Sequence, residues 1–118
     1  MNRHVGDWQA TSAILAGNAF PDEATRSILL TLGEDTYELV AGGRPDRGTS
    51  VTDRNHDPHR VTITGTEGPN AGKTYLAITD FPDEDVMRVA YDLSGSSFPA
   101  SFESTAENRL FVVTYARL

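Results

Sequence analysis

The residues that come closest to a metal site lie around His56 and His59. His56, Asp57 and His59 supply two imidazoles and one carboxylate within four positions, and such groups can hold zinc with water as the fourth ligand. Pro58 interrupts the pair, and the remaining histidine, His4, is distant in the sequence. A solvated loop is therefore the favoured interpretation, and no metal or other cofactor is expected.

Two other segments imitate binding motifs without meeting their spacing. Three residues separate Gly68 from Gly72-Lys73-Thr74, whereas a phosphate-binding loop needs four and must lead into a helix. We expect this segment to join two strands. Asp83-Glu84-Asp85 lacks the glycine-spaced ligands of a calcium loop, so a hydrated acidic turn is expected. The chain also has no cysteine and no Gly-x-Ser-x-Gly nucleophile motif, and we do not expect an enzyme.

The elements that must position any site are strands. All six prolines fall between runs rich in Val, Ile, Thr, Tyr and Phe, and proline marks turns and sheet edges because it cannot donate a ladder hydrogen bond. The pattern predicts an all-β domain: one eight-stranded antiparallel up-and-down barrel spanning residues 1–118. A short helix is expected over 21–27, between the first two strands, where Pro21 and two acidic residues begin the segment. The predicted strands cover residues 6–16, 27–33, 35–41, 47–53, 60–66, 73–80, 85–93 and 108–117.

Period-two alternation predicts which side chains face the barrel interior. Met87, Val89 and Tyr91 share one face of their strand, and Val61 and Ile63 share one face of theirs. The candidate ligand-binding residues of the interior are Tyr37, Leu39, Val61, Ile63, Leu76, Met87, Val89 and Tyr91. Further expected interior residues are Ile28, Leu30, Leu32, Val51, Ile78, Leu110 and Val112.

The two ends of the chain carry a pattern that could close such a barrel. Gly6-Asp7-Trp8 opens the first predicted strand, and Arg117 ends the last one. In the barrel interpretation the Trp8 indole fills the floor, and the Arg117 guanidinium lies over its face as a cation–π contact. Gly6, Trp8 and Arg117 are therefore predicted to have a structural role, while Phe98 and Phe102 either cover a barrel mouth or pack as part of a loop.

The chain resembles an uncharacterised lipocalin-like (calycin-type) bacterial domain family that is abundant in planctomycetes. The resemblance rests on Gly6-x-Trp8, on the stretch from Ile63 to Thr74, on Pro99-x-x-Phe102, and on the closing strand to Arg117. It implies the barrel fold over nearly the whole chain and implies no particular activity.

Composition excludes several classes of partner. The 118 residues include 17 acidic and 10 basic side chains, for a formal charge of −7. This balance argues against binding to nucleic acid or to anionic lipid. No apolar run approaches the roughly 18 residues of a membrane span. The N-terminal residues 1–5 contain no signal-peptide core, which fits a cytoplasmic protein, or an exported one whose leader has been removed.

Two non-enzymatic functions remain open from the sequence, beside the less favoured one of an enzyme or metal protein that uses the His56 and His59 loop. The first is binding of a small apolar ligand inside the barrel, because an eight-stranded barrel can hold one small molecule or be filled by side chains. The alternative is a non-enzymatic protein-interaction or inhibitor-like module with a fully packed barrel. A monomer or weak dimer is expected in either case.

Overall fold

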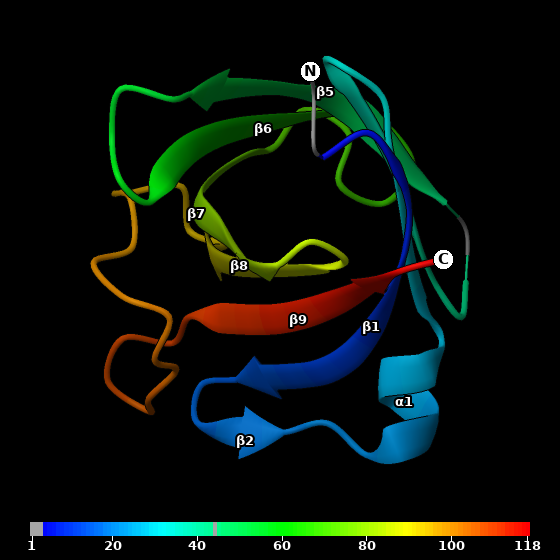
Figure 1. Cartoon of the computed structure of the whole chain (residues 1–118), viewed down its shortest axis with the longest axis vertical. Helices are drawn as coiled ribbons and strands as arrows, with labels where there is room; N and C mark the ends of the chain where they lie inside the picture. The colour runs from blue at the N-terminus through cyan, green and yellow to red at the C-terminus, as the bar shows by residue number, and fades with distance from the viewer. Residues whose placement is uncertain (1–3, 44) are drawn as a thin grey trace.

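The computed structural model describes residues 4–43 and 45–118, so Met1 to Arg3, which begin the segment considered for a leader, lie outside the described residues. Eight antiparallel strands follow one another around a closed barrel (Figure 1). The eight are β1 (Gly6–Leu15), β3 (Ile28–Leu32), β4 (Thr36–Ala41), β5 (Asp46–Asp53), β6 (His59–Glu67), β7 (Thr74–Asp83), β8 (Val86–Asp92) and β9 (Phe111–Arg117). The predicted barrel is confirmed.

The barrel closes where the first and last strands pair. β1 and β9 are antiparallel, with partners from Trp8 and Arg117 at one end to Leu15 and Phe111 at the other. A register shift between Ala10 and Ser12 bends β1, as a β-bulge does. Closure leaves neither of these strands with a free edge along this ladder.

A short excursion joins β1 to β3. Only the first half of β1 pairs with β3. Beyond that point the chain forms the two-residue strand β2 (Asn18–Ala19) and helix α1 (Asp22–Arg26). The helix lies between the first two barrel strands as predicted, although Pro21 occupies the N-cap and not the first helical position. Where β1 and β3 separate, the Gln9 side-chain amide donates to the carbonyls of Arg26 and Ile28, at 2.8 and 3.1 Å.

Alternate residues of the strands form two apolar clusters on opposite faces of the wall. The inner cluster fills part of the barrel and consists of Trp8, Ala10, Ala13, Ile28, Leu30, Ala77, Met87, Val89, Val113 and Tyr115. The outer cluster consists of Ile78, Ala90, Leu110 and Val112, and Phe98 and Phe102 pack against it. Adjacent residues such as Val112 and Val113 therefore belong to different cores, as strand geometry requires.

The outer cluster corrects several sequence-based expectations. Ile78, Leu110 and Val112 were expected inside the barrel but belong to the outer cluster. Of the two arrangements considered for Phe98 and Phe102, the structure has loop packing, because the β8–β9 connection (residues 93–110) runs along the outside of the barrel (Figure 1). These two rings cover an apolar face of β7–β9 that would otherwise be exposed.

Two arginines fix this connection to the wall. The guanidinium carbon of Arg88 lies 4.3 Å from the centre of the Phe102 ring, and that of Arg60 lies 5.0 Å from the Phe98 ring. Arg88 also donates through Nε to Asp80 at 2.9 Å. Within the described part of the chain, no helix has the length and apolar character needed to cross a membrane.

Candidate functional site

The barrel encloses a cavity of about 280 Å³. Small interior residues create it: Ser50 and Thr52 of β5 and Thr79 of β7 stand where larger side chains would fill the space. Gly48 of β5 also faces inward, and a Cβ there would lie 2.7 Å from the Tyr37 ring and 2.0 Å from the Thr64 carbonyl oxygen. The apolar lining consists of Leu30, Leu32, Leu39, Val61, Ile63, Met87, Val89, Leu93 and Phe111.

The structure brings seven of the eight candidate ligand-binding residues together around this cavity. They are Tyr37, Leu39, Val61, Ile63, Met87, Val89 and Tyr91. Leu76 does not line the cavity, and its neighbours Tyr75 and Ala77 face inward instead. The expected register of β7 was therefore wrong by one residue, which also explains the outward position of Ile78.

Val51 was expected inside and lies outside, with 68% of its side chain exposed. Its neighbours Ser50 and Thr52 line the cavity. The error arose because Val51 is the one aliphatic residue in a strand of polar and small residues. Hydrophobicity therefore did not indicate which face of β5 points inward. The signal that would have corrected it is Gly48, two residues before Ser50 on the same face, at a position too crowded for a side chain.

Sequence reasoning missed Asp46, Asn70 and Tyr75, which line the cavity together with the predicted Tyr37; we call these four residues the polar cluster. Asn70 donates from its backbone amide to Asp46 Oδ1 at 3.0 Å and from Nδ2 to Asp46 Oδ2 at 2.9 Å. The Tyr75 hydroxyl donates to Asn70 Oδ1 at 2.7 Å. Asn70 therefore links the start of β5 to β7.

Glycines allow the β6–β7 loop to reach Asp46. Gly68 has φ +92°, and a Cβ there would lie 2.3 Å from the Pro45 carbonyl oxygen. At Gly65 a Cβ would lie 2.1 Å from the Asn70 carbonyl oxygen. The segment that imitates a phosphate loop is thus a connection between strands, as expected, and it contributes Asn70 to the lining of the cavity.

The environment of the polar cluster keeps both phenols protonated. Burial raises the pKa of Tyr37, and the charges of Asp46 and Tyr75 raise it further. Burial and the Asp46 charge also raise the pKa of Tyr75. Both hydroxyls are therefore neutral at physiological pH and can take part in hydrogen bonds inside the cavity.

A second tyrosine pair lies deeper in the barrel wall. The hydroxyls of Tyr91 and Tyr115 are 2.9 Å apart. Burial raises the pKa of Tyr91 to about 12 and the pKa of Tyr115 well above its ordinary value. The Tyr91 ring also stacks on Phe111, with ring centres 5.7 Å apart, so this side of the cavity presents aromatic surface.

Trp8 lies buried at the end of the barrel where β1 begins. The Arg117 guanidinium carbon is 4.3 Å from the centre of the Trp8 ring, and Trp8 Nε1 donates to the His4 carbonyl at 2.9 Å. Gly6 has φ +138°, and a Cβ there would lie 3.0 Å from Arg117 Nη1. The three residues proposed to close the barrel base are therefore adjacent.

The loop histidines do not assemble with other ligands. His56 Nε2 lies 3.4 Å from Asp53 Oδ2, and His59 begins β6. Among the residues that the structure describes, no group of three or more His, Asp or Glu side chains is arranged to hold a metal ion. The alternative of a metal site at His56 and His59 gains no support.

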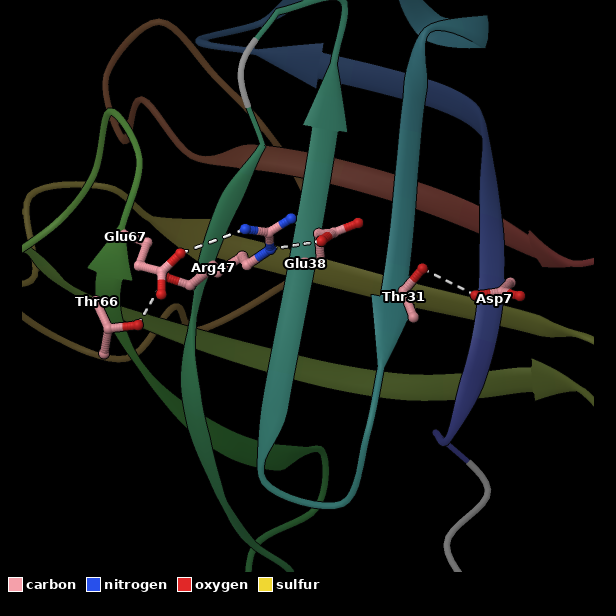
Figure 2. Close-up of polar contacts among 6 residues, drawn as sticks. All are labelled: Asp7, Thr31, Glu38, Arg47, Thr66 and Glu67. Atoms are coloured by element: carbon pink, nitrogen blue, oxygen red, sulfur yellow. Dashed lines mark hydrogen bonds and ion pairs between the residues drawn. The ribbon is translucent and has the colours of Figure 1, made fainter.

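The outer surface of β1 and β3–β6 carries polar contacts between neighbouring strands (Figure 2). Arg47 bridges two acids on neighbouring strands, with Nε 2.6 Å from Glu38 Oε2 and Nη1 3.3 Å from Glu67 Oε2. Thr31 donates to Asp7 across β3 and β1 at 2.8 Å. These contacts mark the solvent side of the strands. The other face of β3–β6 lines the cavity, and that of β1 belongs to the inner cluster.

Comparison with known proteins gave no match, whether with family models, curated proteins or solved structures. The resemblance to the planctomycete-rich lipocalin-like family is therefore not supported by these comparisons. The barrel architecture rests on the strand pairing described above.

Proposed function

We propose that this barrel binds one small, largely apolar molecule in its interior cavity, as lipocalin-like barrels do. The observation that carries the proposal is the cavity itself, about 280 Å³ in a barrel whose remaining interior is packed. An engineered apolar cavity of about 150 Å³ accommodates benzene. The larger cavity here offers room for an aromatic ring with a short substituent.

The lining supports the same function. Aliphatic, aromatic and methionine side chains make up much of the lining, and the polar cluster, His4, Ser50, Thr52 and Thr79 supply its polar groups. This combination is typical of small-molecule sites, in which apolar contact supplies affinity and a few polar groups fix orientation. The alternative of a fully packed barrel acting only through its loops leaves this cavity unexplained.

The first test is direct detection of a ligand. Native mass spectrometry of protein purified from its own host, followed by organic extraction, is expected to show a bound molecule of defined mass. In parallel, the apo protein is expected to bind 2-phenylethanol in isothermal titration calorimetry.

A matched pair of variants locates the binding. Val61 lines the cavity, whereas Val51 of the neighbouring strand faces solvent. Val61→Trp is expected to abolish 2-phenylethanol binding by filling the cavity, and Val51→Trp is expected to leave it unchanged. Thermal melts of both variants establish that they are folded. Equal binding by the two folded variants would place the ligand elsewhere and contradict the proposal.

A further inference from the structure

Asp46 brings a negative charge to the cavity. Its side chain lines the space beside Tyr37 and Tyr75, and no lysine, arginine or histidine of the described ranges forms an ion pair with it. From the described residues, the Asp46 carboxylate accepts two hydrogen bonds, both from Asn70 and one to each oxygen. A carboxylate has about four acceptor positions, so Asp46 retains the capacity to accept from a ligand.

The groups around Asp46 favour one type of ligand head group. Tyr37 lines the cavity, and its hydroxyl makes no hydrogen bond within residues 4–43 and 45–118. The Tyr75 hydroxyl already donates its proton in a hydrogen bond to Asn70. Aromatic rings and a carboxylate together attract a cation, through cation–π contact and through charge-assisted hydrogen bonds. An anionic head group would instead meet the Asp46 charge and a protein of formal charge −7.

We propose that the natural ligand is a small primary amine with an apolar, aromatic-sized body, whose ammonium group binds at Asp46 and Tyr37. This inference rests on the proposed ligand-binding function. The ammonium donates to the free acceptor positions of Asp46 and to the Tyr37 hydroxyl, while the body occupies the apolar part of the cavity near Met87 and Val89. The burial-raised pKa of Tyr37 keeps that hydroxyl neutral beside the carboxylate.

The competing interpretation is that Asp46 serves only to hold the β6–β7 loop through Asn70. The two interpretations differ in what they predict for ligand charge. A purely structural Asp46 gives no preference for a cation over a neutral molecule of the same shape, whereas an ammonium site does.

The test compares three probes of nearly the same shape by isothermal titration calorimetry at neutral pH: 2-phenylethylamine, 2-phenylethanol and phenylacetate. The amine is expected to bind about tenfold to a hundredfold more tightly than the alcohol, as a charge-assisted hydrogen bond would provide. Phenylacetate is expected to bind more weakly than either.

Variants then assign the preference to the site. Asp46→Asn is expected to remove the preference for the amine while the alcohol still binds, and Tyr37→Phe is expected to reduce it severalfold without disturbing the Asp46–Asn70 contacts. The matched control is Glu38→Gln, which removes one negative charge from the outer wall of the adjacent strand (Figure 2). This control is expected to leave the amine preference intact.

The outcomes separate the two proposals. If the alcohol binds as tightly as the amine to the unmodified protein, the ammonium site is overturned and the ligand-binding function stands. The same conclusion follows if Tyr37→Phe and Asp46→Asn, both folded in thermal melts, retain the full preference. If none of the three probes binds, both proposals fail.

Discussion

At the scale of single residues, the cavity depends on side chains that are small or absent. Gly48, Ser50 and Thr52 occupy successive inward positions of β5. Gly48 lies opposite the Tyr37 ring and against the β6 backbone. Pairing a glycine with a cross-strand aromatic ring keeps the wall tight at that level of the barrel. The next two inward positions leave room for the cavity.

Two glycines of the β6–β7 loop provide a prediction at this scale. Gly68 and Gly72 both have positive φ, +92° and +83°, but only Gly68 is crowded. Gly72→Ala is expected to lower the free energy of unfolding by about 1 kcal/mol, the cost of the left-handed conformation alone. Gly68→Ala is expected to cost at least about 2 kcal/mol, because its Cβ must also displace the Pro45 carbonyl. Urea melts compare them, and equal losses would show that the loop has room at Gly68.

At the scale of elements, the β8–β9 connection acts as a side wall. Phe98 and Phe102 cover the outer cluster, and Arg60 and Arg88 stack on their rings. A strand whose two faces are both apolar, such as β9, must be covered on both sides. The barrel interior covers one side of β9 and this connection covers the other.

The side-wall arrangement predicts that stability and ligand binding can be separated. Phe102→Ala is expected to lower the free energy of unfolding by about 1–3 kcal/mol, because the ring is partly buried and stacks on Arg88. Its affinity for 2-phenylethanol is expected to match that of the unmodified protein. Urea melts and calorimetry on the same sample check both points. An affinity that falls with the stability would indicate that packing of Phe102 on the outer face of the wall influences the cavity.

At the scale of the whole molecule, the barrel shelters every tyrosine of the chain. The four tyrosines are Tyr37, Tyr75, Tyr91 and Tyr115, and burial raises the pKa of each. Tyr37 and Tyr75 belong to the polar cluster of the cavity, and Tyr91 and Tyr115 form the deeper hydroxyl pair. The closed barrel thus surrounds the Tyr91 and Tyr115 hydroxyls with a low-dielectric environment, whereas Tyr37 and Tyr75 are only partly buried.

These shifts predict how stability depends on pH. A tyrosine whose pKa is raised in the folded state holds its proton when the unfolded chain has already lost it. Stability from this source is therefore fully present below pH 10 and declines as pH rises from about 10 towards 12, where Tyr91 titrates in the folded protein. Each shifted group contributes a slope of up to about 1.4 kcal/mol per pH unit.

Urea melts from pH 8 to 12, with tyrosinate absorbance followed in the folded protein, check this prediction. Tyr91→Phe is expected to reduce the slope above pH 10. It is also expected to cost about 1 kcal/mol at neutral pH, because Tyr115 loses its hydroxyl partner. Tyrosinate absorbance that reaches the value of all four tyrosines near pH 10 without unfolding would contradict burial of Tyr91 and Tyr115.

The sequence alone determined the order and number of the barrel strands. Proline and glycine punctuation and period-two alternation are local properties, and β6 and β8, where alternation is regular, were oriented correctly: Val61, Ile63, Met87, Val89 and Tyr91 line the cavity. The Gly6, Trp8 and Arg117 pattern could also be read from the two ends, because both belong to strands that meet only if the sheet closes.

Only the tertiary structure decided the inner face of β5 and β7 and the existence of the cavity. In β5 Ser50 faces the interior and the aliphatic Val51 faces solvent. The register is set by pairing with both neighbouring strands and by the crowding at Gly48. The polar cluster joins Asp46 to Asn70 across 24 positions of sequence, through a loop geometry that two glycines permit. Whether side chains fill a barrel depends on volumes summed around all eight strands, and that sum exists only once the strands are in register.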